Sequence, residues 1–227
     1  MNKARLGIAI LFAVLFIPQC LTVPAMYETA EAKQEMRTGV SVQYGEGSYD
    51  TGLYTGLCSS TRYYYQYGGA RVDYARTRKF SEAIEAGYEI GGSIIGYNET
   101  SDDTLYWNRE ALLQVDARPA VKIVTPTKKV RLGLKIAPGL LFYGGVAHQN
   151  TGTELVRELL GFPYASLLCG IGRPEFLTIS LNFPYLYIGL TYHYKNTSFS
   201  TSFLFPPFRG ETEAPSKFFS IGLGWHY

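Results

Sequence analysis

The residues best placed to do chemistry in this sequence are charged side chains that recur at even intervals within short segments. In "LQVDARPAVKIV", for example, Arg118 lies two positions after Asp116, and Lys122 lies four positions after Arg118. The complete set, here called the charge network, comprises Glu85, Glu89, Asp116, Arg118, Lys122, Arg131 and Lys135. Because the side chains of a β-strand alternate between two faces, even spacing puts the charges of each segment on one face of its strand.

The histidines are the other candidates for chemistry, because a hydrolase needs a histidine beside a carboxylate, often with a serine. The chain contains His148, His193 and His226. We expect His148 to share one end of the molecule with Asp102, Asp103 and Glu154, but no wider motif supports catalysis there. His193 and His226 fit better as hydrogen-bonded fillers of an interior. We therefore predict no catalytic residues and no enzymatic activity.

Nothing in the sequence points to a cofactor or a metal. The cysteines Cys20, Cys58 and Cys169 fit neither a disulfide framework nor a spaced metal motif. With 21 basic and 19 acidic residues, the formal net charge is only +2. A balance so close to neutral gives no reason to expect nucleic acid as a partner.

Strands must position these charges, because apolar and polar residues alternate over most of the chain. In "VRLGLKI", Val130, Leu132 and Leu134 fall on one face, whereas Arg131 and Lys135 fall on the other. The segments "FLTISLN", "YLYIGLTYHY" and "KFFSIGLGWHY" repeat the pattern. This period of two predicts β-strands with one apolar and one polar face.

The connections between these segments alternate in length. Short turns such as "TPTKK" and "KN" are interleaved with longer inserts such as "NETSDDTLYWN" and "PPFRGETEAPS". The pattern predicts about ten strands, within a range of roughly eight to twelve, with both chain ends on one side. The predicted fold class is all-β, a closed antiparallel up-and-down β-barrel.

A period of two does not determine which face points inward, so a soluble barrel and a membrane barrel both remain possible. The membrane is favoured because charges and glycines gather on the polar face, as a crowded lumen requires. Aromatic residues such as Tyr44, Trp107 and Trp225 also fall near strand ends, where the interfaces of a bilayer would place them. We therefore predict a transmembrane barrel whose apolar face meets lipid.

The last strand resembles the C-terminal signature of Gram-negative outer-membrane β-barrel proteins, small surface or porin-like barrels among them. The residues that carry the resemblance are Phe219, Ile221, Leu223, Trp225 and Tyr227. In that family the barrel-assembly machinery recognises this segment. The resemblance therefore implies outer-membrane lipids as surroundings, and the assembly machinery and periplasmic chaperones as partners during biogenesis.

Two interpretations of the charge network are open. Its acids and bases could pair and plug a narrow lumen, or they could line a constriction that selects ions or small solutes. Arg71 and Asp73 are candidates to join from the preceding strand. Side chains still block most of the interior of a barrel with about ten strands, which favours the plug.

The N-terminus reads as an export signal, residues 1–25. Lys3 and Arg5 precede an apolar run from Leu6 to Ile17 that is too short to span a bilayer comfortably. Cleavage after Ala25 competes with lipidation at Cys20. We expect residues 26–37 to form a short polar periplasmic segment and residues 38–227 to form the barrel.

One segment, Thr151–Leu160, has the marks of a helix. Thr151 and Glu154 have capping-box spacing, and Gly161 and Pro163 follow the run. The segment would either cover the barrel rim or act as a lid or partner surface.

We thus predict an integral, monomeric outer-membrane barrel with a structural or surface-interaction role. A narrow porin-like channel is the alternative, and a hydrolase that acts on lipid or peptide is the weakest hypothesis.

Overall fold

The computed structural model describes residues 27–50, 62–102, 106–125, 129–172, 174–183, 187–204 and 217–227, and the statements below concern these residues. The predicted signal peptide, Cys20, Cys58 and Asp103 lie outside them. The strands are β1 (Glu35–Asp50), β2 (Arg62–Lys79), β3 (Ile84–Ser101), β4 (Trp107–Val124), β5 (Val130–Ile136), β6 (Gly139–Gln149), β7 (Gly152–Phe162), β8 (Ala165–Gly172), β9 (Glu175–Phe183), β10 (Tyr187–Tyr194), β11 (Thr197–Leu204) and β12 (Lys217–His226). Within the described ranges, no helix is long and apolar enough to cross a bilayer.

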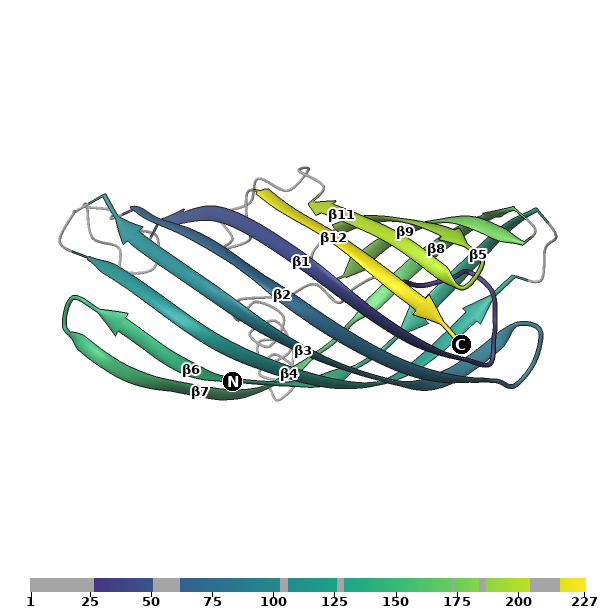
Figure 1. Ribbon diagram of the computed structural model, residues 1–227, viewed down its shortest axis with the longest axis horizontal. Coiled ribbons are helices and arrows are strands. Elements are labelled where there is room, and N and C mark those ends of the chain that lie inside the picture. The colour runs from purple at the N-terminus through teal and green to yellow at the C-terminus, as the bar shows by residue number, and fades with distance from the viewer. Residues whose placement is uncertain are drawn as a thin grey trace, which may run out of the picture.

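All strands belong to one antiparallel sheet that closes on itself (Figure 1). β12 pairs with β1 from Arg37 opposite His226 to Glu46 opposite Lys217. β5 and β6 both pair with β4, one after the other along its length. β8 pairs with β5 and β7 pairs with β6, so β5 with β6 and β7 with β8 each act as one interrupted strand. Pro138 and Pro163 lie at the two interruptions, where the ladder loses an N–H donor. The predicted closed barrel of ten antiparallel strands is confirmed.

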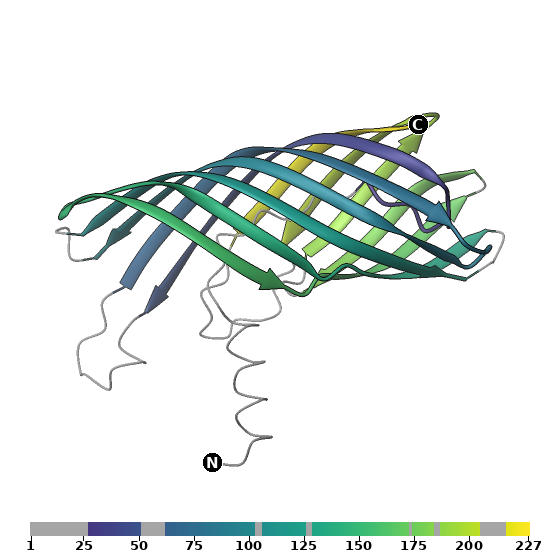
Figure 2. The same cartoon turned by 90° about the horizontal axis from the view of Figure 1, so that it is seen from below.

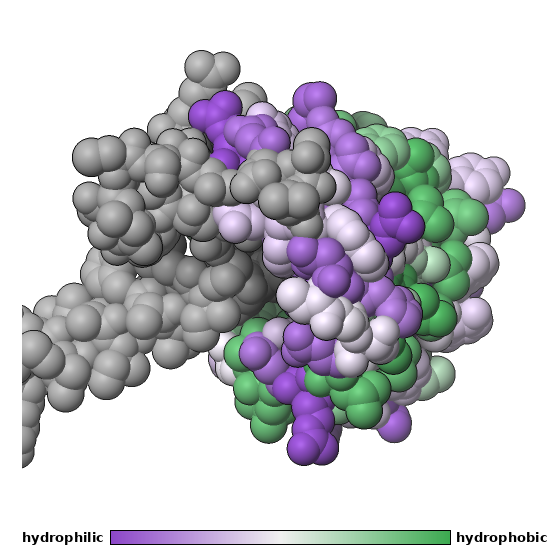
Figure 3. Space-filling view, turned by 90° about the vertical axis from the view of Figure 1, so that its left-hand side faces the viewer, coloured by the Kyte–Doolittle hydropathy of each residue, from purple (hydrophilic) through white to green (hydrophobic). Residues whose placement is uncertain are grey.

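The two predicted faces are also confirmed. Leu134 and Ile179 on the outer face are 39% and 37% exposed, whereas their neighbours Lys135 and Ser180 are 3% and 4% exposed. At the end of the barrel seen in Figure 3, hydrophobic residues gather along the right and lower margins with hydrophilic residues between them. The outer wall is therefore apolar over much of its surface, and the charges point inward.

The barrel wall is much longer on one side than on the other. β1 to β4 have 16–18 residues each, whereas β9 to β12 have 8–10. The long strands and the β6–β7 hairpin project beyond the short strands, at the left in Figure 1 and in Figure 2. We call this projecting part the extension. It lies at the end opposite to the C-terminus and the short turns.

The predicted helix over Thr151–Leu160 is wrong, because residues 152–160 lie in β7 and Thr151 belongs to the turn before it. β7 pairs with β6 along its whole length, from Gly152 opposite Gln149 to Phe162 opposite Gly139. The spacing of four between Leu155 and Leu159 fits one face of a helix and one face of a strand equally well. Backbone pairing with β6 decides in favour of the strand.

The N-terminal segment differs from the expected polar tail. Glu35, Met36 and Arg37 already belong to β1, so the barrel begins before residue 38. Residues 27–34, here called the lumen segment, turn back from β1 into the interior of the barrel (Figure 2). Tyr27, Glu28, Thr29 and Ala30 are all buried there.

Candidate functional site in the barrel lumen

The charge network lies on three consecutive strands that face the lumen. Glu85 on β3 is opposite Lys122 on β4, and Glu89 is opposite Arg118. Lys122 is in turn opposite Lys135 on β5. Arg131 is partly buried, and the other members of the network are buried. Antiparallel pairing thus brings acids and bases of different strands side by side on the inner face.

These neighbours form ion pairs. Lys122 Nζ lies 2.9 Å from Glu85 Oε2, and an Arg118 nitrogen lies 3.3 Å from Glu89 Oε2. Arg118 Nε is also 3.2 Å from Asp116 Oδ1. Lys135 pairs with Glu89. Every charge named here has an opposite charge within reach inside a poorly solvated space.

Two further arginines extend these contacts. Arg71 on β2, which the sequence suggested, donates to Asp116 at 2.6 Å and pairs with Asp73 at 2.7 Å. Arg37 on β1 was missed, because we expected the barrel to start one residue after it. It is buried and shares the parity of Gly39 and Ser41, which is the signal that would have found it.

The acids of the lumen segment bind these basic groups. Glu28 accepts a hydrogen bond from Arg37 at 2.9 Å and another from Lys135 Nζ at 2.5 Å. Lys122 Nζ lies 3.8 Å from the same carboxylate. Three cations from three strands therefore surround one buried carboxylate. Three residues further along the chain, Glu31 pairs with Arg131 at 2.5 Å.

Strand side chains also hold the backbone of the lumen segment. The amide of Ala30 donates to Glu175 Oε1 and the amide of Lys33 donates to Glu85 Oε2, both at 2.8 Å. Lys122 Nζ donates to the carbonyl of Thr29 at 3.0 Å. These side chains satisfy buried backbone groups that no β-ladder could reach.

Tyr27 occupies a slot formed by glycines of β1 and β12. A Cβ atom on Gly39 would lie 1.8 Å from its ring, and one on Gly224 would lie 2.6 Å from it. Gly222 lies beside the hydroxyl group of Tyr27, which donates to the carbonyl of Val40 at 2.6 Å. Larger residues at these positions would fill the space that the ring needs, so the slot depends on glycine.

The opposite wall of the lumen is lined with small residues. The inward positions of β9 to β12 include Ser180, Thr191, Ser198, Ser200, Ser202 and Ser220, all buried. The long charged side chains of β2 to β5 therefore extend toward a wall of small ones. Small residues on one wall of a narrow barrel leave room for long side chains from the other.

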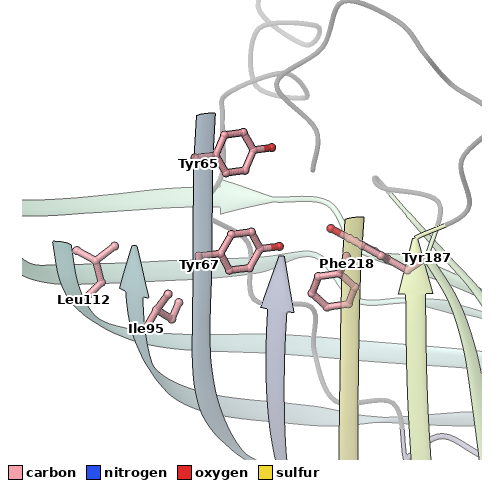
Figure 4. Packing of buried hydrophobic residues seen from close by; sticks show 6 residues of the cluster. All are labelled: Tyr65, Tyr67, Ile95, Leu112, Tyr187 and Phe218. Atoms are coloured by element: carbon pink, nitrogen blue, oxygen red, sulfur yellow. The ribbon is translucent and has the colours of Figure 1, made fainter. Parts of the chain in front are cut away.

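Beyond the charges, toward the extension, an aromatic cluster lies inside the barrel. It consists of Tyr65, Tyr67, Ile95, Leu112, Tyr187 and Phe218. Tyr65 and Tyr67 point from β2 toward the other aromatic rings, and Tyr187 and Phe218 pack with ring centroids 4.6 Å apart (Figure 4). Further out, burial and the Glu99 carboxylate beside it raise the pKa of Tyr106 to about 12. The charges thus lie behind an apolar layer.

The histidines lie in different surroundings, one exposed and the others inside the barrel. His148 is exposed and contacts Thr153 Oγ1 at 2.8 Å, whereas Glu154 follows on the opposite face of β7. His226 does lie between an acid and a serine, 3.4 Å from Glu35 and 3.1 Å from Ser198 Oγ. Ser198, however, is only 2% exposed. Among the described residues, no group of acids, histidines and cysteines is arranged to hold a metal ion.

The residues of the predicted assembly signature lie on the outer face of β12 and just after it. Phe219, Leu223, Trp225 and Tyr227 are exposed, and Ile221 is partly so. Ser220, Gly222 and Gly224 between them line the lumen. This strand therefore serves both surfaces of the barrel.

Comparisons with known proteins give structural likenesses only. No protein-family model matches the chain, and no curated protein matches it in sequence. The transport unit of the autotransporter AIDA-I from Escherichia coli is similar over 97% of both chains, with 8% identity and a TM-score of 0.44. The translocator domain of the autotransporter NalP from Neisseria meningitidis covers 99% of this chain and 96% of its own, with 11% identity and a TM-score of 0.39.

A third similar structure is Ail, the attachment invasion locus protein of Yersinia pestis. It covers 86% of this chain and 100% of its own, with 13% identity and a TM-score of 0.33. The closed antiparallel barrel of this chain has the architecture that the resemblance to outer-membrane barrels implied. Since all three TM-scores are below 0.5, no argument about function rests on these proteins.

Proposed function

We propose that this protein is an integral outer-membrane β-barrel with a closed lumen and a surface-interaction role outside the cell. The observation that carries the proposal is the reversal of its two faces. Exposed leucine, isoleucine and valine side chains cover the outside, whereas arginine, lysine, aspartate and glutamate are buried inside. A soluble barrel would bury its apolar face, but lipid stabilises the arrangement seen here.

Closure of the barrel also supports a location in the bilayer. Every backbone polar group that meets lipid must be bonded within the protein, and pairing of β12 with β1 removes the free edges of the sheet at this level. We propose that outer-membrane lipids surround a monomer there. The chain would reach this membrane by way of the N-terminal export signal predicted for residues 1–25.

The ion pairs and the lumen segment support a lumen that does not conduct. Glu28 bridges β1 and β5 across the interior, and Arg118 and Arg71 connect further strands. The extension supports the interaction role, because β6 and β7 project there beyond the short strands. The side chain of Leu155 on β7 is 84% exposed. Leu159, four residues further along β7, is 66% exposed as well. Neighbouring exposed apolar residues of this kind mark contact surfaces.

One observation favours the alternative, a narrow channel. Small hydroxyl residues line the lumen along β9 to β12, and the buried Gln43 amide has no hydrogen-bond partner in the described part of the chain. A polar wall of this kind could hold a file of water. Conductance across a planar bilayer separates the two functions: the closed barrel predicts none, and a stable single-channel current would favour the channel.

Location is tested by fractionation and by gel mobility. The protein should be recovered with the outer membrane, and unheated samples should migrate faster on SDS gels than boiled ones, because a closed barrel resists unfolding. Recovery as a soluble periplasmic protein would contradict the proposal.

A further inference from the structure

The lumen segment is bound as a peptide ligand is bound, by separate subsites on different strands. Glycines of β1 and β12 form the aromatic slot for Tyr27. Arg37, Lys122 and Lys135 form a carboxylate site around Glu28. Arg131 forms a second carboxylate site for Glu31. The three subsites match an aromatic residue followed by acids at the first and fourth positions after it.

The bonds to the backbone of the segment come from side chains and not from strand edges. Glu175, Glu85, Lys122 and Thr77 make these contacts, the last by donating to the carbonyl of Lys33 at 3.0 Å. The segment therefore takes no part in any β-ladder. The pairing of β1 with β12 that closes the barrel, from Arg37 opposite His226 to Glu46 opposite Lys217, includes no residue of the segment.

The cations that hold the segment each have another acid on a strand. Arg37 lies 3.5 Å from Glu35, Lys122 lies 2.9 Å from Glu85, and Lys135 pairs with Glu89. Arg131 lies 3.6 Å from Glu175. Loss of the segment would leave none of these four cations without an acid. The segment can therefore leave the lumen without the large free-energy cost of a buried charge that has no partner.

We propose that the lumen is a binding site for an acidic peptide with the pattern Tyr-Glu-x-x-Glu, and that residues 27–34 occupy it as a tethered ligand. The segment is joined directly to the start of β1, and such a short connection holds a ligand at a local concentration of about millimolar or higher. Free peptides therefore compete poorly with the native segment. Weakening the three anchors opens the site to a peptide in solution.

The test uses the full-length chain, folded in detergent, with Tyr27→Ala, Glu28→Gln and Glu31→Gln combined and all strands unchanged. A fluorescent peptide with the native sequence YETAEAKQ is titrated against this variant and against the native chain, and its anisotropy is measured. We expect the variant to bind the peptide at least about tenfold more tightly than the native chain does, because the tethered competitor is weakened.

The matched control is the peptide YQTAQAKQ, which keeps the tyrosine but lacks both carboxylates. We expect its affinity for the variant to be lower by about tenfold or more, since charged hydrogen bonds to Arg37, Lys135 and Arg131 are lost. Absence of binding by YETAEAKQ, or equal binding of the two peptides, overturns the proposal.

Heat-dependent gel mobility verifies that the variant is folded before the titration. If the triple variant does not fold, Glu28→Gln alone replaces it and must show the same preference between the two peptides. All measurements are made in detergent, so failure here would leave the proposed membrane function untouched.

Discussion

Glu28 and Lys135 are 107 residues apart in the chain, and Lys135 Nζ donates to Glu28 Oε1 at a distance of 2.5 Å. Both side chains are buried. The pair joins the lumen segment to β5 across the interior of the barrel. It also lies where Arg37 reaches the same carboxylate, so the contact belongs to a network and not to an isolated pair.

A double-mutant cycle of Glu28→Gln and Lys135→Gln should reveal this coupling. Each single substitution should lower the free energy of unfolding by about 1.5–3 kcal/mol, because a charged group loses its hydrogen-bond partner. The double variant should lose less than the sum by at least about 1 kcal/mol, as measured by urea titration in detergent. Lys217 and Glu46 form a solvent-exposed pair at 2.6 Å and provide the control, in which we expect no measurable coupling. Simple additivity for Glu28 and Lys135 would contradict the network.

Removal of both acids from β3 should distinguish a closed lumen from a water-filled one. Glu85→Gln combined with Glu89→Gln leaves Lys122 and Arg118 without their nearest acids on β3. In a closed lumen this should cost about 3–5 kcal/mol with no conductance, since Lys122 and Lys135 would then have to share Glu28 with Arg37 in a desolvated space. In a channel, stability would be preserved and ion selectivity would shift toward anions. Urea titration and bilayer recording of the same preparation decide between the two.

The slot for Tyr27 predicts a clash that a second substitution relieves. Gly39→Ala places a methyl group against the ring and should cost about 1–3 kcal/mol or expel the segment, which would speed trypsin cleavage after Lys33. Adding Tyr27→Ala should remove the penalty of Gly39→Ala, because the methyl group then occupies free space. Gly161→Ala is the matched control, since nothing lies within 4 Å of its Cβ position. Persistence of the penalty in the double variant would mean that the ring is not its cause.

The outer face predicts a dependence on depth in the membrane. Leu134→Arg should cost about 2–4 kcal/mol in lipid vesicles, because Leu134 lies outward on β5 within the closed part of the barrel. Leu155→Arg changes an equally apolar residue in the extension, where water solvates the charge, and should leave the free energy of unfolding unchanged. Equal losses at both positions would refute the assignment of the membrane-embedded zone.

The division of each strand into an apolar and a polar face could be predicted because it depends on a local rule. Successive side chains of a strand point to opposite sides, so a few residues of sequence are enough to predict that Lys135 and Leu134 lie on different faces. The same rule allowed the charge network to be found and the closing strand Phe219–Tyr227 to be oriented. Turn residues and connection lengths were sufficient to indicate an even-numbered barrel.

Where the local pattern of residues fits two different structures, the sequence-based prediction was wrong or could not be made. Leu155 and Leu159 satisfy a helix and a strand alike, and only pairing with β6 makes β7 a strand. Arg37 escaped notice because pairing with a neighbouring strand decides where a strand starts. The pairing of β1 with β12 already includes Arg37, opposite His226. Strand register in turn determines which acid meets which base.

The alternation of residue types therefore determined by itself that this chain forms strands with one apolar and one polar face. The charges and glycines on the polar face then indicated that this face points inward. Only the tertiary structure decided that residues 27–34 fill the lumen, since nothing in "YETAEAKQ" distinguishes a solvated tail from a bound peptide. The difference comes from groups far away in sequence: the glycines of β12, Lys122 on β4 and Lys135 on β5. Folding brings these groups to one place, and the segment binds there because a buried carboxylate is stable only where cations surround it.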